Sequence, residues 1–131
     1  MRRILLEVIA ISLAGLAACN PFAPDQSVIL DVDALSAPAS ITPGSSLTVI
    51  LSVTTGGCTI FDHIAVLRRP ASVQLAAIGR NTAKGRPNVT CPDVIRVDPH
   101  SYTLSPPFES PFLVKVERAT AAALTATVTI Q

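Results

Sequence analysis

The 131-residue sequence is poor in aromatic side chains and in net charge. It contains no tryptophan, one tyrosine and four phenylalanines, and ten basic residues nearly balance nine acidic residues. A nucleic-acid-binding domain is expected to carry a strong positive excess, so this balance argues against that class. The sequence also lacks internal repeats, low-complexity tracts and sustained helical periodicity, so nothing in it predicts a mainly helical fold.

A long apolar run occurs only at the N-terminus, from Ile4 to Leu16, directly after Arg2 and Arg3. A basic start, a short apolar core and small residues before a cleavage point are typical of a secretory signal peptide. The run is shorter than the roughly 20 apolar residues of a permanent transmembrane helix, and Glu7 interrupts it. An N-terminal transmembrane anchor and a twin-arginine export signal are the alternatives, although the residues around the arginine pair fit the second pattern poorly.

The segment Leu16-Ala17-Ala18-Cys19 resembles the lipobox of bacterial lipoprotein precursors, which are lipidated on the cysteine and cleaved before it. The resemblance implies a signal peptide at residues 1–18 and a mature chain tethered to a membrane through lipid on Cys19. Two or more acyl chains, such as palmitate, make a stable anchor. Asn20 implies, by the enterobacterial sorting rule, the outer rather than the inner membrane of the cell envelope. Cleavage without lipidation, which leaves a free thiol, is the alternative.

Lipidation of Cys19 leaves Cys58 and Cys91 as an even pair in an oxidising compartment. We therefore expect a Cys58–Cys91 disulfide. It would close a loop of about 33 residues and contribute about 3 to 4 kcal/mol to stability in the chain-entropy model. A metal or redox pair is disfavoured, because the two cysteines lack the close spacing of such sites.

Removal of the signal peptide leaves 113 residues, with eight basic and eight acidic side chains. This length suffices for one domain with its own core and not for two. Residues 19–26, which contain Pro21 and Pro24, are expected to form a stiff tether between the lipid and the domain. The domain itself is expected to span residues 27–131.

Short β-rich segments separated by turn residues fill the expected domain. The clearest strand alternates apolar residues with serine and threonine from Ser46 to Thr54 and leaves only Ile50 as an apolar residue on its polar side. A helical turn is expected only at residues 118–123. The expected strands are 27–35, 46–54, 59–67, 73–78, 89–97 with a continuation at 100–104, 112–117 and 122–130.

About seven such strands predict an all-β fold, a single antiparallel immunoglobulin-like β-sandwich. The Pro43-Gly44 turn that leads into alternating leucine and valine resembles bacterial immunoglobulin-like domains over about 15 residues. The tryptophan expected in the core of that family is absent. As a whole, the chain resembles small bacterial lipoproteins, and this resemblance implies no particular activity.

Five of the eight mature basic residues lie within 19 positions, with no acidic residue among them. If the two halves of this cluster lie at one end of the sandwich, they form a positive patch for an anionic envelope polymer or for lipid headgroups. A solvated loop is the alternative interpretation. The five residues are Arg68, Arg69, Arg80, Lys84 and Arg86.

Candidate catalytic or metal-binding residues are few. His63 and His100, with a cysteine thiolate, would suit copper, but the only methionine, Met1, is lost with the signal and both thiols are expected in the disulfide. Asp62 is expected to point away from His63, because neighbouring residues on a strand face opposite sides. No metal ion, cofactor or catalytic residue is therefore expected.

Asp31 and Asp33 are expected on one face of a strand, where paired carboxylates invite a calcium interpretation. A calcium site needs six or more oxygen ligands, and no loop supplies them. The sequence thus favours a non-enzymatic binding or structural module, with an anionic polymer or an envelope protein as partner. The alternative is an envelope inhibitor or accessory subunit that acts on a protein partner; a metal carrier or an enzyme is disfavoured.

Overall fold

Valine, isoleucine, leucine and threonine dominate the chain after the tether, and these residues suit a pleated, half-buried surface. The computed structural model describes residues 26–131, and in this range the chain is all-β, without a helix. The expected signal peptide, Cys19 and most of the tether lie outside the described residues. The strands are β1 (Gln26–Ile29), β2 (Asp31–Ser36), β3 (Ser40–Ile41), β4 (Leu47–Gly56), β5 (Thr59–Arg69), β6 (Ser72–Asn81), β7 (Ile95–Leu104), β8 (Phe112–Glu117) and β9 (Leu124–Ile130).

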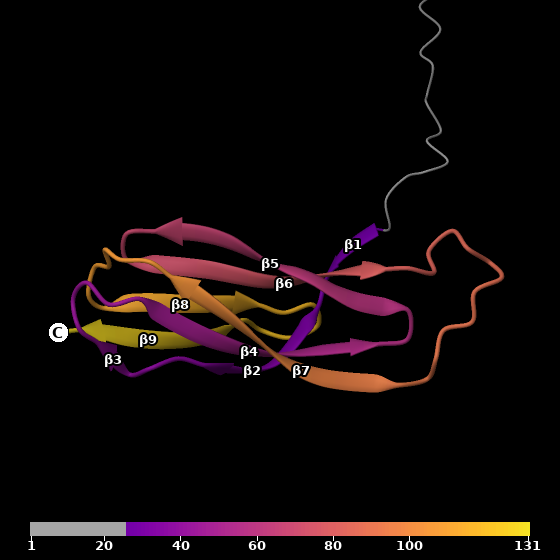
Figure 1. Ribbon diagram of the computed structural model, residues 1–131, viewed down its shortest axis with the longest axis horizontal. Helices are drawn as coiled ribbons and strands as arrows, with labels where there is room; N and C mark the ends of the chain where they lie inside the picture. Colours follow the sequence, from indigo (N-terminus) through magenta and orange to yellow (C-terminus); the bar gives the residue numbers. More distant parts are fainter. Residues whose placement is uncertain (1–25) are drawn as a thin grey trace, which may run out of the picture.

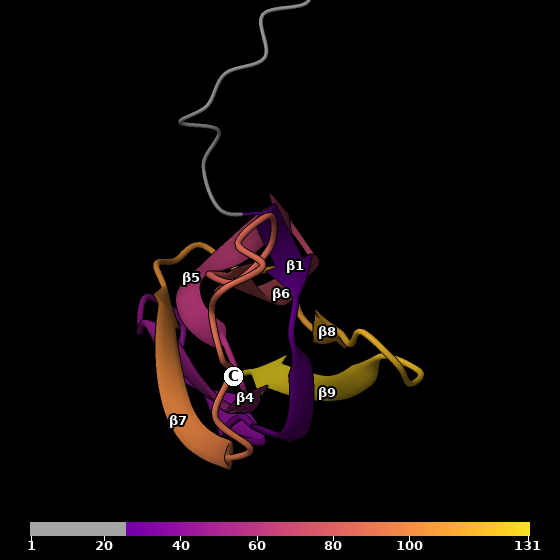
Figure 2. The ribbon, with the colours of Figure 1, turned by 90° about the vertical axis from the view of Figure 1, so that its right-hand side faces the viewer.

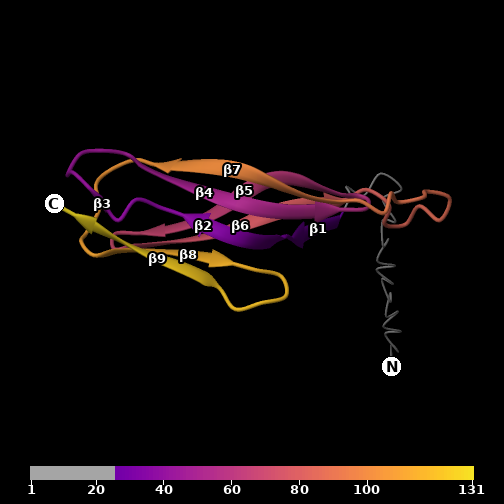
Figure 3. The ribbon, with the colours of Figure 1, turned by 90° about the horizontal axis from the view of Figure 1, so that it is seen from below.

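The strands form two sheets that run along the long axis of an elongated domain (Figure 1). The smaller sheet has the order β2-β4-β7, and the larger has β5 and β1 beside β6, followed by β8, β9 and β3. Seen from below, β4 and β7 lie on one side of the domain and β8 and β9 on the other (Figure 3). The end-on view shows the strands arranged around a common interior (Figure 2). The expected two-sheet, all-β architecture is confirmed, but the expectation of a purely antiparallel sandwich is wrong, because β6 pairs with β8 and β3 pairs with β9 in parallel.

The core lies between the two sheets and follows the alternation of the sequence. Leu47, Val49, Leu51 and Val53 of β4 are fully buried, whereas Ile50 on the opposite face is exposed. A strand with one face on the core and one in solvent shows this pattern. The residues that face β4 across the core are apolar and buried too: Val73, Leu75 and Ala77 of β6, Phe112, Val114 and Val116 of β8, and Val128 of β9.

The first expected strand, residues 27–35, is divided between the two sheets. Residues 26–29 pair with the end of β6, and the chain then crosses so that β2 pairs with β4. Leu30 lies at the crossing, is buried, and donates its backbone N–H to the carbonyl of Ala77 at 2.8 Å. Gly79 makes room for it, because a Cβ at position 79 would lie 2.6 Å from Leu30 Cδ2.

Strand β6 is the most connected strand of the larger sheet. It pairs with β5 along its whole length, while its other edge is shared by β8, which runs parallel to its first half, and β1, which runs antiparallel to its second half. The parallel β6·β8 pair arises because the chain visits the smaller sheet as β7 between these two strands.

Other expectations need correction at element boundaries. The strand expected at 89–97 starts only at Ile95 and continues to Leu104, through Pro99. Pro99 is tolerated because β7 is the edge strand of its sheet. The expected helical turn at 118–123 is absent, and a two-residue strand, β3, pairs in parallel with β9.

Candidate functional site

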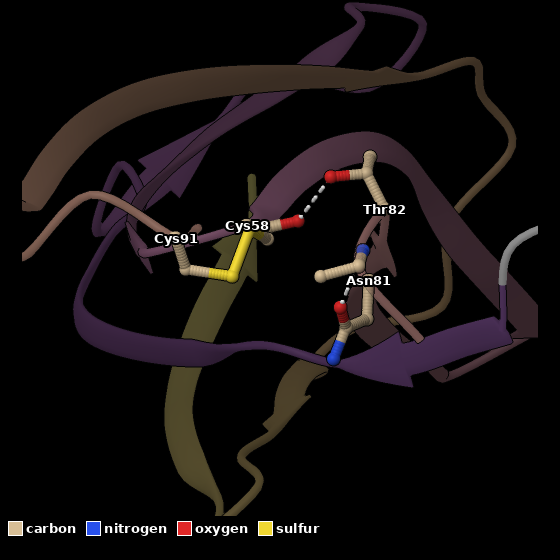
Figure 4. Close-up of a disulfide and its surroundings, with 5 residues drawn as sticks. Cys58, Asn81, Thr82 and Cys91 are labelled. Atoms are coloured by element: carbon tan, nitrogen blue, oxygen red, sulfur yellow. Dashed lines mark hydrogen bonds between the residues drawn. A yellow bond between two sulfur atoms is a disulfide. The ribbon is translucent and has the colours of Figure 1, made fainter. Parts of the chain in front are cut away.

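The Cys58–Cys91 disulfide fastens one end of the sandwich, which we call the disulfide end and define by this bond and residues 80–94. The bond joins the turn after β4 to the segment before β7, with an S–S distance of 2.02 Å (Figure 4). Thr82 donates to the Cys58 carbonyl twice, through its backbone N–H at 2.9 Å and its hydroxyl at 2.8 Å. Thr82 and Cys91, at the two ends of the loop of residues 82–91, are thus both tied to Cys58 in the turn after β4. The disulfide expected from the sequence is confirmed.

Glycine at position 57 lets the chain turn sharply enough to present Cys58. Its φ of +60° lies in the left-handed region, which glycine adopts without a steric penalty. Its N–H donates to the carbonyl of Val94 at 3.2 Å, so the turn is held against the segment that follows Cys91. Gly57 thereby holds the turn that carries Cys58 against the segment that carries Cys91.

The five basic residues expected to form one patch lie in two separate groups. Arg69 pairs with Ser72 at the β5–β6 turn, whereas Arg80 pairs with Ile60 near the opposite end of the same hairpin. At about 3.3 Å per residue, the two groups are roughly 25 to 30 Å apart. The expectation of a single patch is therefore corrected: Arg80, Lys84 and Arg86 belong to the disulfide end, and Arg68 and Arg69 to the other.

We call that other end the turn end and define it by the β5–β6 turn and residues 105–111. There the guanidinium of Arg68 donates to the carbonyl oxygens of Ser105 and Pro107 and lies 4.6 Å from the centre of the Phe108 ring. Because these contacts engage both terminal nitrogens of the guanidinium and one of its faces, Arg68 helps to hold the segment 105–108 against β5. A pocket of about 560 Å³ opens beside it, lined by Arg68, Arg69, Pro70, Pro107, Phe108 and Glu109.

Asp62, His63 and Arg80 form a chain of polar contacts near the disulfide end. Asp62 Oδ2 lies 2.6 Å from His63 Nδ1, and Asp62 Oδ1 lies 3.1 Å from Arg80 Nε. The expectation that Asp62 points away from His63 is wrong. The register of β5 against β6 shifts between Phe61 and His63, and such a bulge breaks the alternation of faces.

This carboxylate orients a histidine, yet the described residues add no further catalytic member. Within residues 26–131, the hydrogen bond of His63 runs to Asp62 alone, and covalent catalysis needs a nucleophile in reach of the base. His100 stacks on Phe61 instead, with the ring centres 3.7 Å apart. Both thiols considered for copper are in the disulfide, and no three His, Cys, Asp or Glu side chains of the described range cluster for a metal ion.

The two aspartates considered for calcium serve different threonines. Asp31 accepts hydrogen bonds from the backbone N–H of Thr120 at 3.1 Å and from its hydroxyl at 3.0 Å. Asp33 accepts one from the hydroxyl of Thr54 at 2.9 Å. The Asp31–Thr120 bonds fasten β2 to the connection between β8 and β9. Both carboxylates therefore accept hydrogen bonds that stabilise the fold.

A cleft of about 590 Å³ runs between β5 and β7, beginning at the disulfide end. Each of these strands pairs on one side only, so both present unpaired backbone groups. The stacked rings of Phe61 and His100 line the cleft, together with Ile60 and the Arg96–Asp98 pair, whose charged atoms are 3.7 Å apart. The arrangement offers aromatic surface, backbone hydrogen bonds and charges of both signs to a ligand.

Sequence reasoning missed the cleft and the exposed apolar residues near it in the chain, of which Ile60 and Val94 line the cleft. Ile95 is 79% exposed, and Ile60, Val89, Val94 and Val97 are exposed as well. The signal in the sequence was the apolar content of residues 89–97, which predicts a strand. The segment before Ile95 is instead a loop.

Within residues 26–131, no helix has the length and hydrophobicity that crossing a bilayer requires. Comparisons with known proteins yield no relative from which a role could be transferred. The chain matches no protein-family model, no curated protein and no solved structure.

Proposed function

We propose that the chain is the precursor of a lipid-anchored cell-envelope protein whose mature part is a non-enzymatic binding or structural module. In this proposal, residues 1–18 are removed and Cys19 carries the lipid, with the outer membrane as the destination because Asn20 follows it. One observation carries the proposal: the lipobox cysteine stands seven residues before Gln26, where a disulfide-bonded β-domain begins. A disulfide suits the oxidising space outside the cytoplasm.

The cleft between β5 and β7 supports a binding role for the domain. Sandwich domains commonly bind through loops and free edges. Here the aromatic pair, the unpaired backbone edges and the apolar side chains of Ile60 and Val94 meet at one cleft. The carboxylates of Asp31, Asp33 and Asp62 all make contacts with other residues of the domain. This favours a binding role over catalysis.

The second candidate is an inhibitor or accessory subunit that engages a protein partner. It is favoured by the free edge of β5, which is apolar from Ile64 to Leu67 and exposes Val66 and Leu67. An extended segment of a partner can add to such an edge as a further strand.

We further infer that the sandwich is immunoglobulin-like in architecture. Two face-to-face sheets, and a short early strand, β3, that pairs in parallel with the last strand, support this inference. The parallel β6·β8 pair and a disulfide located in the connecting segments are departures from that pattern. An experimental structure that shows a different strand order would refute it.

Replacement of Cys19 by alanine is expected to abolish incorporation of labelled palmitate, because the thiol is the attachment point of the lipid. Metabolic labelling followed by gel autoradiography measures this. The matched control is the Cys58→Ala/Cys91→Ala variant, which should still be labelled. Persistent labelling of the Cys19→Ala protein would refute the anchor.

A photo-crosslinking residue at Leu67 is expected to capture a specific envelope protein in intact cells if β5 is a partner-binding edge. The complex should survive high salt, because main-chain pairing and apolar contacts dominate it. The control position is Thr127, an exposed residue of β9, which lies away from β5 in the same sheet. Equal or absent capture at the two positions would exclude the β5 edge as the binding site.

A further inference from the structure

The cleft between β5 and β7 has the size of a ligand site and a lining without excess charge. Its volume of about 590 Å³ falls within the roughly 300 to 1,000 Å³ that is usual for such sites. Among the described residues that line it, the ionisable side chains apart from His100 are Arg96 and Asp98, one of each sign. An anionic polymer is attracted by an excess of positive charge, so this lining favours an uncharged ligand.

Arg96 and Asp98 are exposed and only weakly paired, so a ligand can reach both. Arg96 Nε and Asp98 Oδ2 are 3.7 Å apart, beyond hydrogen-bond distance, and the two side chains are 71% and 46% exposed. A guanidinium only donates hydrogen bonds and a carboxylate only accepts them. Because a hydroxyl group does both, two neighbouring hydroxyls of a ligand can bond to both side chains at once. Thr55 and Thr59, which also line the cleft, add hydroxyl groups to the lining.

An aromatic surface lies beside this pair. Phe61 of β5 and His100 of β7 stack with their ring centres 3.7 Å apart, where the two strands lie next to each other in the end-on view (Figure 2). Arg96, Asp98 and His100 share one face of β7, because they are two residues apart in a strand whose register against β4 is unbroken. The lining thus combines aromatic rings with polar groups. The C–H groups of a sugar ring pack on aromatic rings, and its hydroxyls remain available for polar partners.

The strand edges along the cleft do not suit an extended peptide. β5 has a bulge between Phe61 and His63, where its register against β6 shifts. β7 contains Pro99, which has no backbone N–H. Bulges and prolines interrupt the regular row of donors and acceptors with which an added strand would pair. The segment from Ile64 to Leu67, considered above for a protein partner, does not line the cleft.

We propose that the cleft binds a neutral oligosaccharide. One sugar ring packs its C–H groups on the surface formed by Phe61 and His100, and neighbouring hydroxyls of the oligosaccharide bond to the guanidinium of Arg96 and the carboxylate of Asp98. This ligand class rests on the binding role proposed above and makes it specific.

The test measures binding of the purified mature protein to an array of neutral and acidic oligosaccharides, with chitohexaose, cellohexaose and maltohexaose among the neutral ones. Binding to at least one neutral oligosaccharide is expected, and isothermal titration calorimetry with that oligosaccharide gives its affinity. The Arg96→Ala/Asp98→Ala variant should bind it about tenfold or more weakly, because the charge-assisted hydrogen bonds to the hydroxyls are lost. High salt should leave the affinity nearly unchanged, because a neutral ligand has no charge to be screened.

The matched control is Lys115→Ala/Glu117→Ala, which removes an exposed pair of opposite charges, 3.1 Å apart, from the face of β8 that points away from the core. It should bind as tightly as the unaltered protein. Three results would overturn the proposal: no neutral oligosaccharide binds, only acidic ones bind and do so in a salt-dependent way, or the control loses as much affinity as the cleft variant.

A photo-crosslinking residue at Ile60, which lines the cleft and is 45% exposed, separates this failure from failure of the proposed function. In intact cells it is expected to capture a glycan. Capture of a protein instead would overturn the oligosaccharide and leave the binding module in place. Capture of neither would overturn the oligosaccharide and the binding role of the cleft together. Palmitate labelling of Cys19 reports the anchor independently of these outcomes.

Discussion

Replacing Phe112 with alanine is expected to lower the free energy of unfolding by about 3 to 5 kcal/mol. Phe112 is fully buried, and its ring meets that of Phe108 edge-on at a centre-to-centre distance of 5.0 Å. Truncation removes apolar surface from the centre of the core and leaves a cavity between two sheets that cannot fully close over it. It also removes the ring that supports Phe108 beneath Arg68. Urea unfolding of the purified mature protein measures the change.

Leu113 is the matched control for Phe112, since it follows directly on β8 and faces the other way. Its side chain is 39% exposed, so Leu113→Ala should change the free energy of unfolding by less than about 1 kcal/mol. Similar losses for the two variants would mean that β8 does not present Phe112 to the core in the register described.

Loss of the Cys58–Cys91 disulfide is expected to lower the free energy of unfolding by about 3 to 4 kcal/mol, because the unfolded chain regains the entropy of a loop of about 33 residues. For a domain of this size the midpoint of thermal unfolding should fall by roughly 15 to 25 °C. The Cys58→Ala/Cys91→Ala variant, followed by circular dichroism on heating, measures the shift. Thr82 and its bonds to the Cys58 carbonyl remain, so the loss is expected to reside mainly in the unfolded state.

Reduction of the wild-type protein is the independent test of the same bond. Dithiothreitol should lower its unfolding temperature to that of the double variant, and it should leave the double variant itself unaffected. Alkylation before reduction should modify neither cysteine. Two alkylatable thiols in the untreated mature protein, or an unfolding temperature insensitive to reductant, would contradict the disulfide.

Alternation in the sequence predicted the strands that have one face in the core and the other in solvent. The β4 alternation identified its buried residues and the exposed Ile50, and the alternations of β8 and β9 identified those strands, because a half-buried strand must repeat every two residues. The pattern failed where neighbours in space decide the outcome. Residues 27–35 read as one strand, but Leu30 turns into the core over Gly79 and divides it.

The candidate site was predicted less well than the fold. Opposite faces were expected for Asp62 and His63 because alternation holds in a regular strand, and a bulge set by pairing with β6 overturned this. One basic patch was expected because its residues are close in sequence. The hairpin instead carries them to opposite ends, since β5 and β6 are each long enough to span most of the domain.

By itself the sequence determined the properties that depend on local or covalent chemistry: the all-β class, the alternating core faces and the even cysteine pair that remains once Cys19 is assigned to lipid. It also contains the segment Leu16-Ala17-Ala18-Cys19, whose resemblance to a lipobox is the basis of the proposed anchor. Only the tertiary structure decided which residues share an end of the sandwich. It joined the first strand to the disulfide loop and brought the free edges of β5 and β7 together around Phe61 and His100. Strand order and register determine which residues become such neighbours, and both depend on the packing of the whole core. A short stretch of sequence therefore does not predict them.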